Sequence, residues 1–112
     1  MHIIRRTIIN RVFVSLIKEY FGDFKNDKMY EIRRVVRGWT EKNIRTGRHV
    51  TVSCGYDGER IEGTIGEVVI GALSEIFDHI PFKLIVPRAP NRNRAWCMIR
   101  DVVGIAPQYI AF

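Results

Sequence analysis

Apolar residues recur at helical spacing near the start of the chain. The first stripe consists of Ile8, Ile9, Val12, Phe13, Leu16, Ile17, Tyr20 and Phe21. This i, i+1, i+4, i+5 pattern predicts an amphipathic helix over residues 7–21, and Gly22 follows as a C-terminal cap. A second stripe consists of Met29, Ile32, Val35, Val36 and Trp39. It predicts a second helix over 29–39, which Gly38 ends or kinks.

The middle of the chain changes to a period of two. Polar and apolar residues alternate around Val50 and Val52 and predict a strand over 49–53. The sequence Gly55-Tyr-Asp-Gly58 is typical of a turn, so a short returning strand is expected over 59–62. Thr64 and Glu67 have the spacing of a capping box, which predicts a third helix over 65–79.

The last third of the chain is interrupted by prolines. Pro81 ends the third helix, and the apolar residues 82–86 predict a strand. Residues 87–93 read as a loop and 95–103 as a further strand, with a helix as the alternative. Residues 104–112 are expected to lie across the core or to form an edge strand. The predicted fold is α+β, with two N-terminal helices, a hairpin, a third helix and a small, mostly antiparallel sheet.

Length and composition place this chain among single-domain proteins. It has 112 residues, of which 46% are hydrophobic, so residues 1–112 are expected to form one compact domain with its own core. Arg5, Arg6 and Arg11 interrupt the N-terminal apolar stretch too often for a signal peptide or a membrane span. A cytoplasmic location is therefore expected. Cys54 and Cys97 are expected to be reduced, buried thiols. The histidine and cysteine spacings of zinc sites are absent, and no metal or cofactor is expected.

The distribution of charged residues indicates a function more clearly than any motif does. The formal net charge is +6, and thirteen of the eighteen basic residues are arginine. Residues 33–48 carry six basic residues against one acid, and residues 88–100 carry four against none, with one tryptophan in each stretch. Arginine binds phosphate in bidentate fashion and stacks on rings. These two stretches therefore favour a polyanion-binding surface.

The candidate binding residues come from the two basic stretches and one exposed turn. They are Arg33, Arg34, Arg37, Arg45, Arg48, Tyr56, Arg88, Arg92, Arg94 and Arg100. The sharpest candidate is the loop 88–94, which Pro87 and Pro90 stiffen. It reads as a phosphate-binding hairpin tip, as a solvated turn or as a protein-contact loop. Tyr56 could stack on a base. The two tryptophans are expected in the core.

These residues support three hypotheses. The first is a small basic nucleic-acid-binding protein without catalysis, whose binding depends on salt and for which RNA and DNA stay unresolved. The second is a compact inhibitor or adaptor, of the kind found among phage-type accessory factors, that binds an acidic protein surface. The third is a small RNA-cleaving toxin. His49 and Cys54 lie five positions apart on one strand and so face opposite sides, which argues against a catalytic pair.

Overall fold

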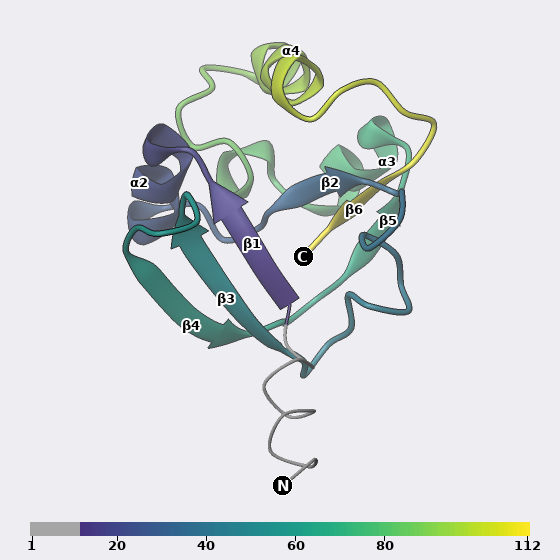
Figure 1. Ribbon diagram of the computed structural model, residues 1–112. Coiled ribbons are helices and arrows are strands. Elements are labelled where there is room, and N and C mark those ends of the chain that lie inside the picture. Colours follow the sequence, from purple (N-terminus) through teal and green to yellow (C-terminus); the bar gives the residue numbers. More distant parts are fainter. Residues whose placement is uncertain (1–11) are drawn as a thin grey trace, which may run out of the picture.

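Two three-stranded sheets form the framework of the computed structural model, which describes residues 12–112 (Figure 1). The first sheet has the order β1-β3-β4 and consists of β1 (Val12–Leu16), β3 (His49–Cys54) and β4 (Arg60–Thr64). In it, β1 runs parallel to β3, and β3 runs antiparallel to β4. The second sheet is antiparallel, has the order β2-β6-β5, and consists of β2 (Ile32–Arg34), β6 (Tyr109–Ala111) and β5 (Val69–Gly71).

Helices flank both sheets. They are α2 (Lys18–Asn26), α3 (Leu73–His79), the 3-10 helix η1 (Phe82–Leu84) and α4 (Arg92–Val102). Helix α2 packs beside β1 and β3, and α3 packs on β5 and β6. In Figure 1, α4 lies across the top of the molecule, above β1 and β2. The class is therefore α+β, as expected, but the predicted order of elements is wrong.

The predicted N-terminal helix over 7–21 is wrong. Residues 7–11 lie outside the described part, 12–16 form β1, and α2 begins only at Lys18. In β1 the side chains of Val12, Val14 and Leu16 are buried, whereas those between them are half-buried. The alternation of a strand is not evident from the sequence, because Phe13 is also apolar. The apolar residues of β1 therefore fit the spacing of a helix as well. Gly22 lies inside α2 and is not a cap.

The predicted second helix over 29–39 is also wrong. Its centre forms β2, which pairs with β6, and turns follow from residue 35 onward. The backbone of Glu31 extends this pairing, because its N–H and its carbonyl oxygen both bond to Phe112. Pairing with the far end of the chain therefore overrides a helical pattern only eleven residues long.

The hairpin is confirmed, with small shifts at its ends. Strand β3 pairs with β4 so that Val52 lies opposite Ile61 and Val50 lies opposite Gly63. Gly55 opens the turn with a φ of 69°, which an L side chain adopts only with strain.

The third predicted helix is correct only in its second half. Thr64 belongs to β4, residues 69–71 form β5, and α3 begins at Leu73. The proposed capping box is therefore wrong. At the actual start of α3, the Glu75 carboxylate accepts the Ala72 N–H at 2.9 Å. The stripe was read too far toward the N-terminus because Ile65 is buried in the core without being helical.

The last third of the chain also needs correction. Residues 82–84 form a 3-10 helix instead of a strand, and 95–102 belong to α4, so the helical alternative is correct there. The loop at 88–94 is not a hairpin tip, because Arg92 already opens α4. Asn91 caps this helix, with its side-chain oxygen accepting the Arg94 N–H at 2.9 Å. Strand β6 lies at the centre of its sheet and not at an edge.

The core consists of two clusters that meet at β6. Tyr109 and Ala111 belong to the cluster under α3 and α4, whereas Ile110 points into the cluster of the first sheet. This alternation along one strand joins the two halves. Both cysteines are free, but Cys54 is half-buried and Cys97 is exposed on α4. The expected burial of Cys97 is therefore wrong.

Candidate anion-binding surface and cavity

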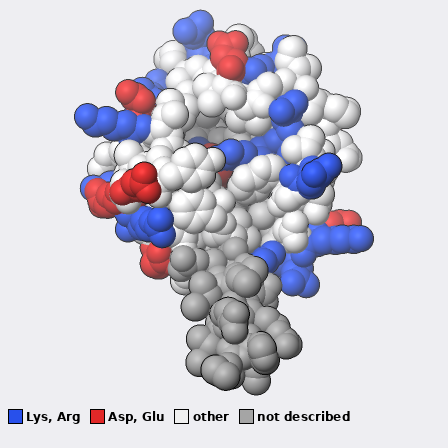
Figure 2. All heavy atoms as spheres, in the orientation of Figure 1, with Lys and Arg blue, Asp and Glu red and all other residues white. Residues whose placement is uncertain are grey.

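A cavity of about 260 Å³ opens where the two sheets and α4 meet. It is lined by Ser15, Leu16, Ile17, Tyr20, Lys28, Glu31, Ile32, Arg33, Arg34, Val36, Trp39, Ile85, Val86, Met98, Ile99, Val102 and Val103. The face in Figure 2 is hollowed, with basic and acidic atoms visible inside the hollow. The walls are mostly apolar, and the charged side chains come from β2 and the residues just before it.

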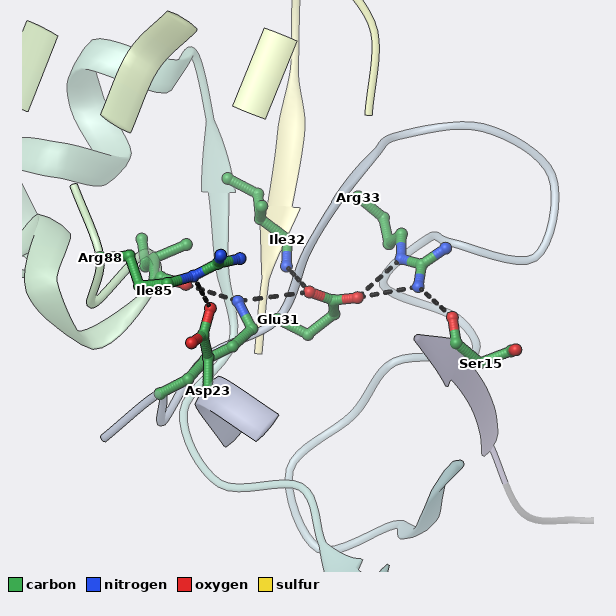
Figure 3. A network of polar contacts seen from close by, with 8 residues as sticks. Ser15, Asp23, Glu31, Ile32, Arg33, Ile85 and Arg88 are labelled. Carbon is green, nitrogen blue, oxygen red and sulfur yellow. Dashed lines mark hydrogen bonds and ion pairs between the residues drawn. The ribbon is translucent and has the colours of Figure 1, made fainter. Parts of the chain in front are cut away.

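Lys28, Glu31 and Arg33 form a charged network in this cavity. Lys28 and Glu31 are only 7% and 8% exposed. The Lys28 Nζ donates to the Ile85 carbonyl oxygen at 2.5 Å and lies 3.5 Å from the Glu31 Oε1. The Glu31 Oε1 also accepts the Ile32 N–H, and its Oε2 accepts from the Arg33 Nε and Nη2 at 3.1 and 2.8 Å (Figure 3). Every oxygen of this buried carboxylate thus has partners.

Burial lowers the pKa of Lys28, because removing the ammonium from water disfavours its charged form. Glu31 opposes this shift through its charge and its hydrogen bond, and the charge of Asp23 adds a smaller effect in the same direction. The network is thus a buried lysine kept in place by one carboxylate and one carbonyl oxygen.

Arg33 links the two sheets. From β2, its Nη2 donates to the carbonyl oxygen of Ser15 in β1 at 3.2 Å (Figure 3). Its guanidinium carbon lies 4.8 Å from the centroid of the Trp39 ring, which stacks on Phe112 at 6.0 Å. The Trp39 ring therefore packs against two other side chains of this protein, Arg33 and Phe112. Trp96 likewise packs against Phe77, so both tryptophans contact the core, as expected.

The basic surface consists of Arg34, Arg37, Lys42, Arg45 and Arg48, at the end of β2 and in the segment that leads to β3. Glu41 is the only acid in residues 34–48, which gives this stretch a formal charge of +4. Four of the five basic residues are exposed, and Arg48 is half-buried. In Figure 2, lysine and arginine atoms gather on the side of the molecule that carries this segment in Figure 1.

Packing and hydrogen bonds hold the basic surface in one shape. Ile44 is only 1% exposed and anchors the segment in the core of the first sheet. The Ile44 N–H bonds to the Thr40 carbonyl oxygen, and the Gly47 N–H bonds to that of Ile65. The Arg48 Nη1 donates to the Asn43 carbonyl oxygen at 2.5 Å. In residues 12–112, the side chains of Arg34, Arg37, Lys42 and Arg45 make no ion pair or hydrogen bond.

Arg88 and Arg92 have acidic partners. The Arg88 Nε bonds to the Asp23 carboxylate at 2.8 Å, and its guanidinium lies over the Tyr20 ring. The Arg92 Nη1 lies 2.9 Å from the Asp78 carboxylate, and its Nη2 donates to the Ser74 carbonyl oxygen. These two arginines therefore attach the loop and the start of α4 to α2 and α3.

The other predicted residues are spread over the molecule. Arg94 and Arg100 are exposed on α4. Arg34 lies near the C-terminal end of α4, because a Cβ on Gly104 would come within 3.2 Å of its Nε. Tyr56 is 76% exposed and stacks on Phe13. It lies at the far end of β3 from Arg48, and a strand of six residues separates them by roughly 20 Å.

Two polar clusters were not found from the sequence. In the sequence, Lys28 and Glu31 look like an ordinary surface pair at i, i+3, and nothing local marks them as buried. The second cluster is exposed: the Glu67 carboxylate accepts from the Tyr30 hydroxyl at 2.9 Å and lies 2.9 Å from the His79 Nε2. The contacts from His79 and then from Tyr30 lower the pKa of Glu67. Within residues 12–112, no three histidine, cysteine or acidic side chains are arranged to hold a metal ion.

No family model matches this chain, and no curated protein or solved structure matches it. Among the helices of residues 12–112, none is long and apolar enough to cross a membrane. The basic surface and the cavity are therefore the features of this protein that indicate a function.

Proposed function

We propose that this protein binds nucleic acid, without catalysis, through the basic surface formed by Arg34, Arg37, Lys42, Arg45 and Arg48. The observation that carries the proposal is a segment of charge +4 that is anchored by the buried Ile44 and directs exposed arginines into solvent. Within residues 12–112, no hydrogen bond is made by the side chains of Arg34, Arg37 and Arg45. Their donors are therefore available to phosphate oxygens.

The rigid shape of the segment favours binding. A surface that is already ordered loses less conformational entropy when it meets a ligand. Each arginine that neutralises a phosphate releases condensed counterions, so affinity falls linearly on a logarithmic scale as salt rises. Arg94 and Arg100 extend the contact over α4. Arg88 and Arg92 contribute less, because phosphate must compete with Asp23 and Asp78 for their guanidinium groups.

Two matched triple variants test the proposal. One replaces Arg34, Arg37 and Arg45 with glutamine, and the other makes the same change at Arg60, Arg88 and Arg92. The net charge changes equally in both. Binding of a labelled duplex is measured by fluorescence anisotropy over a series of salt concentrations. The first variant should lower the slope of log affinity against log salt by about 2.7, or by about 2 for a single strand. The second should lower it much less.

An equal loss in both variants would mean that net charge alone drives binding, and it would contradict the proposed surface. Absence of nucleic-acid binding by the wild type, together with copurification of an acidic protein, would favour the inhibitor or adaptor hypothesis instead. Degradation of mixed RNA by the pure protein would favour the RNA-cleaving toxin. We place the activity in the cytoplasm, because two unpaired cysteines, one of them exposed, suit a reducing compartment.

A further inference from the structure

The cavity between β1, β2 and α4 has the composition of a ligand site. Twelve of its seventeen lining residues are apolar or aromatic, and its charged groups converge from β2 and the residues before it. Binding sites for small molecules are typically apolar cavities with a few placed polar groups. Cavities for drug-sized ligands begin at about 300 Å³. A volume of about 260 Å³ therefore suits a smaller molecule.

The charged residues that line the cavity favour a negatively charged ligand. Lys28, Arg33 and Arg34 are basic, and Glu31 is the only acid among the lining residues. Glu31 is fully occupied by Lys28, Arg33 and the Ile32 N–H. The Arg33 Nε and Nη2 are also engaged, but its Nη1 and the whole guanidinium of Arg34 have no partner among residues 12–112. In Figure 3, the remaining terminal nitrogen of Arg33 carries no dashed line.

The cavity mouth is apolar. Ile17, Val36 and Val102 line the cavity and are 57%, 45% and 56% exposed. They are three of the seven large hydrophobic residues that are exposed in the described part of the chain. An apolar ligand body would cover them, while its charged end would meet unoccupied arginine donors. A purely ionic ligand would leave them in water, and a cation would be repelled by the arginines.

We propose that this cavity binds a small amphipathic anion, namely a molecule with an apolar body and one carboxylate head group. The head group accepts hydrogen bonds from Arg33 and Arg34, and the body packs between Ile17, Val36 and Val102. The Arg33 side chain is only 26% exposed, which strengthens its bond to a carboxylate relative to the same bond in water. This site is distinct from the phosphate-binding role of the basic surface, with which it shares only Arg34.

Octanoate is a suitable probe, with octanol and octylamine as its neutral and cationic counterparts. Trp39 lines the cavity, so a Trp96→Phe protein reports on it through the fluorescence of a single tryptophan. Octanoate should change this signal in a saturable way. Octanol should bind at least about tenfold more weakly, because it lacks the charge-assisted bond to arginine. Octylamine should not bind. Equal binding of all three would reduce the cavity to an unselective apolar surface and overturn the proposal.

Exposed residues supply matched variants that leave the core intact. Val102→Glu places a negative charge at the cavity mouth and should reduce octanoate affinity at least about tenfold. Ile105→Glu adds the same charge at a residue that is 70% exposed and does not line the cavity, and it should have no effect. Arg34→Met should weaken octanoate binding, whereas Arg37→Met should not. Circular dichroism checks that each variant is folded.

The outcomes separate this site from the proposed nucleic-acid function. Arg37→Met should weaken nucleic-acid binding and leave octanoate binding unchanged, whereas Val102→Glu should reduce octanoate binding far more than nucleic-acid binding. No saturable response to octanoate in the wild type would overturn the cavity proposal alone. The same holds if Val102→Glu and Ile105→Glu bind octanoate equally well.

Discussion

Replacing Glu31 with alanine tests the charged network that holds the cavity and both sheets in place. The variant leaves the Lys28 ammonium, only 7% exposed, with the Ile85 carbonyl oxygen as its remaining hydrogen-bond acceptor. It also removes the acceptor of the Ile32 N–H and two hydrogen bonds from Arg33. Breaking a buried ion pair by removing one partner costs about 3–5 kcal/mol.

The expected loss lies at the lower end of that range. Arg33 is 26% exposed, and the network borders a cavity that water can enter, so part of the lost interaction is replaced by hydration. We expect the free energy of unfolding to fall by about 3 kcal/mol. This is a large share of the roughly 5–15 kcal/mol by which such domains are stable. Urea unfolding followed by circular dichroism measures the loss.

A double-mutant cycle with Lys28→Met gives the control. Methionine has nearly the shape of the lysine stem but no charge to leave unpaired. The loss in the double variant should therefore be smaller than the sum of the two single losses, by about 0.5–3 kcal/mol. Additive losses, or a loss below about 1 kcal/mol for Glu31→Ala, would refute the assignment of a buried, coupled pair.

The pH dependence gives an independent check on Lys28. Burial lowers its pKa in the folded protein below the ordinary value of about 10.4. Between these two values the unfolded chain binds more protons, so the contribution of Lys28 to stability rises with pH through that window. In Glu31→Ala the rise should begin at lower pH, because the carboxylate that raises the pKa is gone.

Three further predictions concern other parts of the fold. Asn91→Ala should lower the free energy of unfolding in urea by about 1 kcal/mol, because the cap of α4 is lost. The control Asn93→Ala, on the exposed first turn of α4, should change this free energy by less than about 0.5 kcal/mol. The pKa of Glu67 is lowered in the folded protein, so its carboxylate stabilises the fold above the unfolded pKa of about 4.3. This contribution is lost as pH falls through the folded pKa. Glu67→Gln should therefore be less stable than wild type near neutral pH, and the difference should disappear in acid. In native alkylation followed by mass spectrometry, Cys97 should react faster than Cys54. Equal rates would contradict the exposed position of Cys97 on α4.

Local signals predicted the parts of the fold that depend on neighbouring residues. The β3–β4 hairpin was recognised because a period of two and a Gly-Xaa-Asp-Gly turn lie side by side in the sequence. The stripe of Leu73, Ile76 and Phe77 likewise matches the buried face of α3. The strand pairing of the hairpin and the buried face of α3 are each determined by residues within about ten positions of one another.

Elements that depend on distant partners were not predicted. Strand β1 is stabilised by parallel pairing with β3, and its Phe13 is covered by Tyr56 and Arg60 from the hairpin. The apolar run of β1 fits a helix equally well until those partners are known. Strand β2 has three residues and, among the strands of residues 12–112, pairs only with β6 at the other end of the chain. No local pattern could indicate that pairing.

In the candidate site, too, features that depend on neighbouring residues were predictable, and those that depend on distant residues were not. An excess of arginine over acid in residues 33–48 indicated an exposed basic segment, and its arginines other than Arg33 and Arg48 are exposed. Which arginines have acidic partners is decided by tertiary structure. Asp23 reaches Arg88 because α2 lies beside the loop before α4, and Asp78 reaches Arg92 because α3 lies beside the first turn of α4. The cavity was not foreseeable, because its lining comes from segments far apart in the sequence.

The most direct test of the proposed function is an NMR titration of the ¹⁵N-labelled protein with a short oligonucleotide. Backbone amide shifts should concentrate in residues 34–48, with smaller changes at Arg94 and Arg100. Signals from the turn at Tyr56 should stay in place, because this turn lies at the far end of β3 from Arg48. Shifts confined to the hairpin turn or to residues 88–92, with residues 34–48 unchanged, would contradict the proposed binding surface.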